Sequence, residues 1–258
     1  MLSRRLVVCL DVAGGKVVKG VQFESLKTMG DPAELASRYE LEGADEIVFL
    51  NIAASSEDAA KLIETVSRTA DTLFIPLTVG GGINSVEDAG RMLRAGADKV
   101  SINSAAVIRP TVLTEAAMRY GSQCVVASID ARKEESGWRV YTGGGRNRTE
   151  LDAVEWARKC AELGAGEILL TSIDRDGTRS GYDIELTRAV SESVHVPVIA
   201  SGGGGGSADV VEVLTKGCAD AALIAGALHD GSCTVTELKT SMQRNGIRVR
   251  EAAWATVS

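Results

Sequence analysis

Short apolar runs alternate along the chain with longer segments of helical period. The runs are rich in Val, Ile and Leu, and they occupy Leu6–Asp11, Glu46–Asn51, Ile75–Val79, Lys99–Asn103, Cys124–Asp130, Glu167–Ser172, Pro197–Ser201 and Ala221–Ala225. Between them, segments with Asp, Ser or Thr near their starts and Gly at their ends predict helices, for example Asp31–Gly43, Ser85–Ala95 and Thr149–Gly164. Strands that read as continuous apolar runs indicate a parallel sheet covered by helices. Eight such units in 258 residues, with no linker between them, predict one (β/α)8-barrel domain over residues 1–258.

An internal repeat divides this predicted barrel into two similar halves. Val7–Asp11 resembles Val126–Asp130, and Gly43–Ile47 resembles Gly164–Ile168. Gly80–Gly82 and Ala97-Asp98 recur in the same order as Gly202–Gly204 and Ala219-Asp220. The alternative is that all strand–helix units look alike. We interpret the repeat as two half-barrels, about 1–122 and 123–250, each carrying its own copy of every ligand-binding feature.

Composition excludes several classes of protein. The 28 Lys and Arg against 35 Asp and Glu give a net charge of −7, and no basic run offers a surface for nucleic acid or an anionic membrane. No apolar stretch is long enough to span a bilayer, and the N-terminus lacks the features of a signal peptide. Five cysteines without a CxxC pair, and only two histidines, argue against disulfides and a metal centre. We therefore expect a cytoplasmic protein with reduced thiols and without a histidine-rich metal centre.

Glycine runs directly after predicted strands are candidate phosphate sites. Such loops let backbone N–H groups approach an anion, and the following helix adds its positive N-terminal end. In barrels of this kind, phosphate commonly binds after strands 7 and 8, which here means Gly203, Gly204 and Gly226. The repeat predicts a second site near Gly82, Asn103 and Ser104. Each run alone is also compatible with a tight turn, but the pair in repeat register predicts a ligand with a phosphate at each end.

Two aspartates also occur in repeat register, at the C-terminal tips of strands 1 and 5. Polar groups at this face of a barrel are typically catalytic, and opposed carboxylates suit general acid–base chemistry. Asp11 and Asp130 are therefore candidate catalytic residues, unless they cap neighbouring loops. The long connection from Val12 to about Gly30 carries Lys19, which as part of a lid would reach a phosphate or a reacting oxygen. A surface loop with solvated lysines is the alternative.

Four charged residues stand at the opposite ends of the strands. Arg5, Glu46, Lys99 and Glu167 begin strands 1, 2, 4 and 6, and strand alternation places Arg5 on the same face as Asp11. Charges inside the base of a barrel are costly unless they are paired. The residues are either solvated strand ends or a charged ring that closes a passage through the barrel.

Several motifs together resemble a known family, the cyclase subunits of imidazole glycerol phosphate synthase among the histidine-biosynthesis barrels. They are Cys9–Val12, Val17–Gly20, Thr78–Ile83, Ala95–Asn103, Gly121–Gln123, Gly164–Ser172, Asp174–Thr178 and Ser201–Gly203. The similarity covers roughly residues 2–250. The Val-Val-Lys-Gly and Asp-Arg-Asp-Gly-Thr stretches distinguish these subunits from the sister isomerase of the same pathway.

The resemblance implies a particular reaction. Ammonia is added to a bisphosphorylated aminoimidazole carboxamide ribonucleotide that bears a ribulosyl group, and the molecule is cleaved and closed to imidazole glycerol phosphate and aminoimidazole carboxamide ribotide. Asp11 and Asp130 match the catalytic pair, Lys19 accompanies them, and Thr171, Asp176 and Gly177 fall in the substrate site. No metal or cofactor is implied.

The resemblance also implies a partner. A separate glutaminase subunit would supply ammonia at the N-terminal face, through a gate formed by Arg5, Glu46, Lys99 and Glu167. Asp45, Asp98 and Gln123 would lie where the two subunits meet.

This chain departs from the family pattern at four positions. Asn51 stands where an aspartate is usual, Gly143 lies near the position of a histidine, Glu150 near that of a glycine, and Gly226 replaces a serine. A lost neutral hydrogen bond costs about 0.5–1.5 kcal/mol, so we expect weaker substrate binding and not loss of activity. Two alternatives stay open: the sister isomerase, which needs no ammonia, and an impaired barrel that serves as a glutaminase-binding scaffold.

Overall fold

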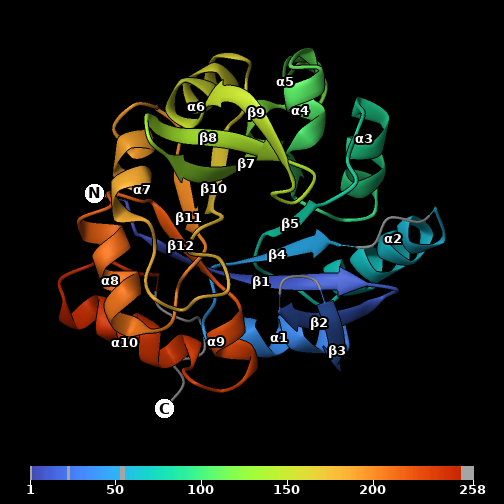
Figure 1. The fold of residues 1–258 in the computed structure, drawn as a ribbon. Helices are drawn as coiled ribbons and strands as arrows, with labels where there is room; N and C mark the ends of the chain where they lie inside the picture. Colours follow the sequence, from blue (N-terminus) through green and yellow to red (C-terminus); the bar gives the residue numbers. More distant parts are fainter. Residues whose placement is uncertain (1, 22–23, 53–55, 251–258) are drawn as a thin grey trace.

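The computed structural model describes residues 2–21, 24–52 and 56–250, and for 19–21, 24–27 and 56–59 the backbone alone. Eight strands form its central barrel (Figure 1). They are β1 (Arg5–Ala13), β4 (Glu46–Asn51), β5 (Leu77–Gly80), β6 (Lys99–Ile102), β7 (Val125–Glu134), β10 (Glu167–Ser172), β11 (Val198–Ser201) and β12 (Ala221–Ile224). All eight predicted strands are therefore confirmed.

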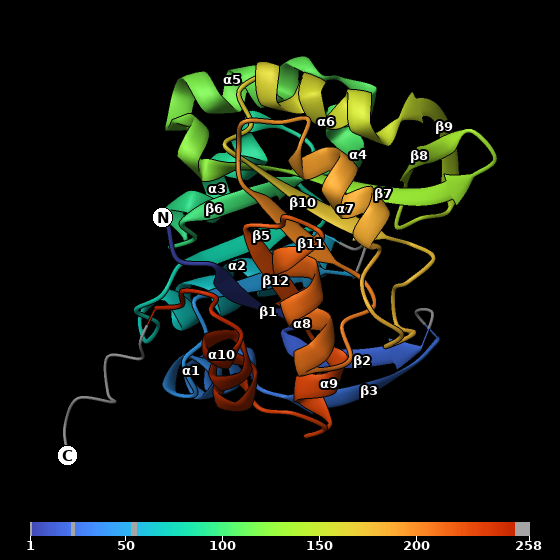
Figure 2. The same cartoon turned by 90° about the vertical axis from the view of Figure 1, so that its left-hand side faces the viewer.

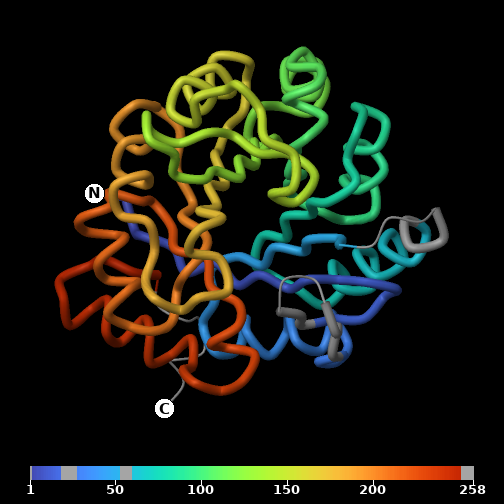
Figure 3. Tube along the Cα trace, in the orientation of Figure 1, coloured from blue at the N-terminus to red at the C-terminus, as the bar shows by residue number. Residues whose placement is uncertain are grey.

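The eight strands close into a ring of parallel neighbours. Their order is β10-β11-β12-β1-β4-β5-β6-β7, and a further pairing of β10 with β7 closes it. β1 lies beside β12, so the first and last strands of the barrel are neighbours, as the colours of the Cα trace show (Figure 3). The predicted (β/α)8 barrel is confirmed.

Helices follow the strands and cover the outside of the barrel. They are α1 (Pro32–Leu41), α2 (Ser56–Ala70), α3 (Val86–Arg94), α4 (Ser104–Ile108), α5 (Thr111–Tyr120), α6 (Ala153–Glu162), α7 (Ile184–Ser191), α8 (Ser207–Thr215), α9 (Gly226–His229) and α10 (Val235–Arg244), with a 3₁₀ turn η1 (Ser122–Cys124). Alternation along β1 separates the two apolar cores. Leu6, Val8 and Leu10 pack beneath the helices, whereas Val7 and Cys9 face the interior of the barrel.

The predicted helix starts agree with the structure in two of three cases. Asp31 and Ser85 cap α1 and α3, and their side chains accept hydrogen bonds from backbone N–H groups of the first turn. The helix expected from Thr149 begins later, at Ala153, because Asp152 is its cap. Residues 149–152 belong to a strand instead, and this part of the prediction was wrong.

Two antiparallel flaps extend from the strands that carry the candidate aspartates. One is β2 (Lys16–Val21) with β3 (Glu24–Gly30), joined to β1; the other is β8 (Gly137–Thr142) with β9 (Asn147–Asp152), joined to β7. Both project from the same end of the barrel, on the right of Figure 2. The connection expected as a loop lid is therefore strand structure. The division into halves at about residue 122 stays a prediction, although each half carries one flap.

A repeated aspartate clamp holds the opposite, N-terminal end of the barrel. Asp45 accepts from the Leu6 N–H at 2.8 Å and returns its own N–H to the Leu6 carbonyl at 3.0 Å. Asp98 binds Leu77 in the same two-point manner, at 2.8 and 2.9 Å, and Asp220 binds Val198 at 3.1 and 2.9 Å. Each clamp satisfies an N–H near the start of the preceding strand. This N–H belongs to the first residue of β5 and of β11 and to the second residue of β1.

In the pair formed by β7 and β10, the residue that corresponds to these aspartates is Gly166. It donates to the Val125 carbonyl at 2.9 Å but has no side chain. A Cβ there would lie 2.3 Å from the Ser122 carbonyl oxygen, so η1 excludes an aspartate. The Val125 N–H donates to Ser122 O instead, so the turn replaces the missing carboxylate.

Replacing one clamp should weaken the fold measurably. Asp98→Ala is expected to cost about 1–3 kcal/mol of unfolding free energy, because the Leu77 N–H lies at a buried residue and loses its acceptor. Asp98→Asn keeps an acceptor oxygen and should cost less. Urea unfolding of the purified chain measures both. An alanine variant with an unchanged midpoint would show that the clamp contributes nothing to stability.

Candidate active site

Asp11 and Asp130 lie on opposite sides of the barrel mouth. β1 and β7 are four strands apart in either direction around the ring. Asp11 shares the interior face of β1 with Cys9, whose Sγ donates to Asp11 Oδ1 at 3.8 Å. Asp130 accepts from Asn103 Nδ2 at 2.9 Å and pairs in register with Thr171. Two of the predicted substrate residues thus border the second carboxyl group.

Both carboxyl groups hold their protons more tightly than an ordinary aspartate. Burial raises the pKa of Asp11 to about 6, and the nearby charge of Asp176 adds to this effect. Burial likewise raises the pKa of Asp130 to about 6, with Asp176 again contributing and Asn103 opposing. A carboxyl group of this kind exists in both forms near neutral pH, as a general acid or base requires.

Asp176 brings a third carboxylate to the mouth. Its charge acts on both Asp11 and Asp130, although it comes from the connection between β10 and α7. Burial raises its pKa too, and a hydrogen bond from the Gly177 backbone opposes that shift. Asp176 and Gly177, which sequence motifs placed in the substrate site, therefore belong to the same electrostatic environment as the two predicted catalytic residues.

The first candidate phosphate site lies after β5 and β6. Gly82 has a φ of +75°, with nothing but the Asn51 amide near its missing side chain. Gly81 has no such room, since a Cβ would lie 2.1 Å from the Asn51 carbonyl oxygen. Ser104 begins α4, and its Oγ accepts from the Gly143 N–H at 3.0 Å. The turn between β8 and β9 therefore contacts this site.

The second candidate phosphate site lies after β11 and β12. A Cβ on Gly203 would lie 2.2 Å from Gly181 O, and one on Gly204 would lie 2.4 Å from the Tyr182 hydroxyl. Packing against the β10–α7 connection thus requires both glycines, whatever they bind. Gly226, at the start of α9, accepts from Arg179 Nη2 at 3.1 Å.

Arg179 was missed in the sequence because no motif isolates a single arginine in a loop. It also forms an ion pair with Asp230, so it joins the β10–α7 connection to α9. Its φ of +55° is unusual for a residue other than glycine. Arg179 brings a positive charge next to Gly226.

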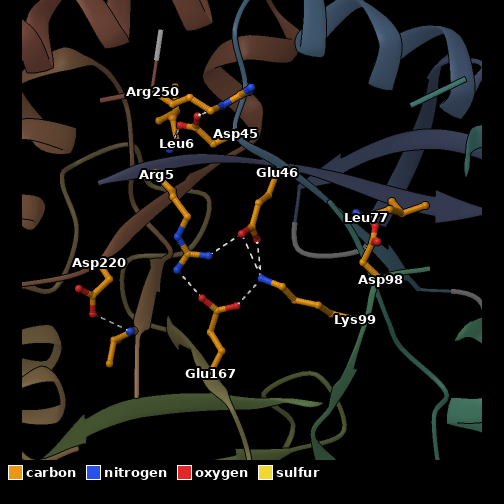
Figure 4. A network of polar contacts seen from close by, with 11 residues as sticks. Arg5, Leu6, Asp45, Glu46, Leu77, Asp98, Lys99, Glu167, Asp220 and Arg250 are labelled. Atoms are coloured by element: carbon orange, nitrogen blue, oxygen red, sulfur yellow. Dashed lines mark hydrogen bonds and ion pairs between the residues drawn. The ribbon is translucent and has the colours of Figure 1, made fainter. Parts of the chain in front are cut away.

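The predicted gate residues form a closed ring of ion pairs at the N-terminal end (Figure 4). Arg5 binds Glu46 at 2.5 Å and also binds Glu167. Lys99 binds Glu46 at 3.0 Å and Glu167 at 2.8 Å. The side chains of Glu46 and Glu167 are only 5% and 7% exposed. The four charges therefore pair within the barrel and are not solvated strand ends.

The three expected interface residues stand at the same end but differ in their surroundings. Asp45 is buried, and besides its clamp it accepts from Lys239 Nζ at 2.7 Å. It also accepts from Arg250 Nε at 3.1 Å (Figure 4). Asp98 and Gln123 are exposed. Asp45 therefore ties α10 to the barrel, whereas the other two are accessible to a partner.

Two further titratable residues are Lys19, which the sequence analysis predicted, and His229, which no motif identified. Lys19 lies in β2, and its side chain is outside the described residues. His229 lies in the outer wall, with Tyr39 Oη 2.8 Å from its Nδ1 and the Cys9 carbonyl oxygen 3.0 Å from its Nε2. It therefore joins α1, α9 and β1.

No helix in the described part of the chain is long and apolar enough to cross a membrane.

A (β/α)8 barrel with titratable carboxyl groups at its C-terminal mouth and glycine loops on both sides belongs to the class of barrel enzymes. Comparison with known proteins narrows this class. A family model described as "Histidine biosynthesis protein" matches residues 5–234. The chain belongs to this family.

The relatives agree in name. The chain is 64% identical to the imidazole glycerol phosphate synthase subunit HisF of Myxococcus xanthus, over 97% of this chain and 99% of that protein. It is 56% and 54% identical to the proteins of that name from Prochlorococcus marinus strains SARG and MIT 9211, over 97% of this chain and 98% of each relative. The resemblance to the cyclase subunits is confirmed.

Proposed function

We propose that this chain catalyses the ammonia-using reaction of imidazole glycerol phosphate synthase, with Asp11 and Asp130 as its acid–base pair. The observation that carries the proposal is the pair of carboxyl groups, four strands apart, each with a pKa raised to about 6. The substrate would lie between them, with one phosphate near Gly82 and Ser104 and the other near Gly203 and Gly226.

The chemistry needs proton transfer at more than one point. When ammonia adds to the ribulosyl carbonyl group, its oxygen must be protonated before it leaves as water. When the molecule is cleaved, the departing nitrogen of the ribotide needs a proton, and ring closure releases one. Two carboxyl groups on opposite sides of the mouth, each able to donate and accept near neutral pH, supply these transfers without a metal.

A glutaminase partner would supply the ammonia at the N-terminal face. The ring of Arg5, Glu46, Lys99 and Glu167 closes the barrel interior at that face, and the exposed Asp98 stands beside it (Figure 4). Because the ring is made of ion pairs, it can exchange partners without breaking the backbone. We therefore infer that it acts as the gate between a docked glutaminase and the catalytic mouth.

The first test is turnover with free ammonium. The purified chain, the bisphosphorylated ribulosyl substrate and an ammonium salt at alkaline pH should yield imidazole glycerol phosphate and the ribotide, and neither without ammonia. Conversion without ammonia would support the isomerase. Tight substrate binding without turnover would support the scaffold, and Asn51 and Gly226 would then be the first substitutions to revert.

A further inference from the structure

We propose that Arg146 binds one of the two substrate phosphates, at the end of the site that contains Asn103 and Ser104. The inference rests on the proposed function, since it takes the bisphosphorylated ligand from there. It adds a residue that neither motif nor repeat identified, from the turn between β8 and β9.

The turn between β8 and β9 is fixed to this end of the site. Gly143 donates its N–H to Ser104 Oγ at 3.0 Å, and its carbonyl accepts from Arg146 Nε at 2.7 Å. A single residue, Gly143, thus connects the Ser104 hydroxyl with the guanidinium. Gly143, Gly144 and Gly145 have φ angles of +64°, +68° and +78°, so a left-handed turn without side chains brings the backbone over the site.

Among the described residues, no carboxylate neutralises the charge of Arg146. Arg148, two residues along the same hairpin, binds Glu134 at 2.8 Å and Glu150 at 2.6 Å. Arg146 has no carboxylate partner among the described residues; its Nε is held by Gly143, and its side chain is exposed. Arg148 therefore serves the fold, and Arg146 presents its terminal nitrogens to a ligand.

The second flap holds Arg146 next to the position that corresponds to Lys19 in the first flap. In the first flap, Lys19 comes two residues after Val17, which pairs with the residue that follows Asp11. In the second flap, the corresponding position is Thr142, two residues after Val140, which pairs with the residue that follows Asp130. Thr142 begins the turn and accepts from the Arg146 N–H at 3.1 Å. The second flap thus has a neutral residue at the position of Lys19, and that residue holds the Arg146 backbone.

A guanidinium suits this task. Its planar fork binds phosphate through two parallel hydrogen bonds, and charge-assisted bonds of this kind are among the strongest in proteins. With Nε occupied by Gly143, the two terminal nitrogens stay available. Ser104 retains its hydroxyl proton, because it acts as the acceptor toward Gly143, and that proton can be donated to the same phosphate.

The test uses the two reaction products, because each carries one phosphate and occupies one end of the site. Calorimetric titration of the full chain with imidazole glycerol phosphate and with the ribotide needs no turnover. Arg146→Gln should raise the Kd of one product about 10–100-fold, as expected for the loss of charge-assisted hydrogen bonds, and change the other about twofold or less. Arg146→Lys, which keeps the charge without the fork, should fall between. Arg148→Gln is the matched control and should change neither Kd by more than about twofold.

Several outcomes would overturn the inference. Equal weakening of both products by Arg146→Gln would indicate only a general electrostatic effect. Equal behaviour of Arg146→Gln and Arg148→Gln would indicate a role in the hairpin alone, which a lowered melting temperature would reveal. If the wild-type chain binds neither product, the proposed function itself fails. If it binds both and turns over, but Arg146→Gln is silent, only the role of Arg146 fails.

Discussion

Asp11→Asn should lower ammonia-dependent turnover about 10²–10⁴-fold, the contribution usual for a general acid or base. The amide has the shape of the carboxyl group but cannot exchange a proton near neutral pH. Asp130→Asn should lower turnover by a similar factor, because its carboxyl group has the same raised pKa of about 6 on the opposite side of the mouth. Steady-state kinetics with saturating ammonium measure both. Product affinity is the control and should change about twofold or less; near-normal turnover would reassign the proton transfers to another group.

Asp11→Asn should also stabilise the protein, and the size of this stabilisation should depend on pH. Burial raises the pKa of Asp11 from an ordinary 3.8 to about 6, so the native state binds this proton more tightly than the unfolded chain does. In the wild type, the Asp11 carboxyl group therefore contributes most to the free energy of unfolding below about pH 4. This contribution declines as the pH rises to about 6. Asparagine lacks this dependence. The variant should equal the wild type at low pH and be more stable by about 2–3 kcal/mol above pH 6, which unfolding at several pH values measures.

Glu167→Gln should destabilise the chain by about 3–5 kcal/mol, the usual cost of removing one partner from a buried ion pair. Glu167 is the acceptor for both Arg5 and Lys99, and its loss leaves two cations with Glu46 alone. Little water can reach the two cations in place of the lost carboxylate, because the Glu167 side chain is almost fully buried. Urea unfolding of the chain without a partner gives the free energy directly.

A compensating substitution tests whether charge balance is the cause. In the double variant Lys99→Met/Glu167→Gln, one cation and one anion remain, and Arg5 keeps its 2.5 Å contact with Glu46. The double variant should therefore be more stable than the sum of the single effects predicts. Strict additivity would contradict a coupled ring. Turnover with free ammonium should persist in both variants, because the ring lies at the end opposite the catalytic mouth.

Buried parallel strands were predictable from the sequence because each is apolar on both faces and so stands out as a continuous run. The flaps were not. β9 reads Asn-Arg-Thr-Glu-Leu-Asp, has no apolar run, and is held by its pairing with β8 and not by burial. For the same reason residues 149–152 were assigned to the following helix, whose true start is marked by the Asp152 cap.

Glycine runs and repeated aspartates located the site, but their packing roles appear only in three dimensions. Gly81 and Gly203 are required by neighbouring backbone oxygens, which no local pattern reveals. The recurring Ala-Asp pairs at 97–98 and 219–220 were recognised as a repeat, yet their clamp depends on strands far away in sequence. Arg146 and Arg179 were missed because a lone arginine in a loop has no distinguishing pattern until its partners are known.

We expect the barrel interior between the ion-pair ring and Asp11 to act as a filter for charge. Arg5 and Asp11 are six residues apart on one strand, a path of about 20 Å at 3.3 Å per residue. The interior around this path includes an apolar cluster with Val7, Cys9, Val48, Val126 and Leu169. An ammonium ion would lose its hydration there at a large free-energy cost, whereas neutral ammonia would not. A molecule that entered at the ring would therefore leave its proton behind and would reach the mouth already as a nucleophile.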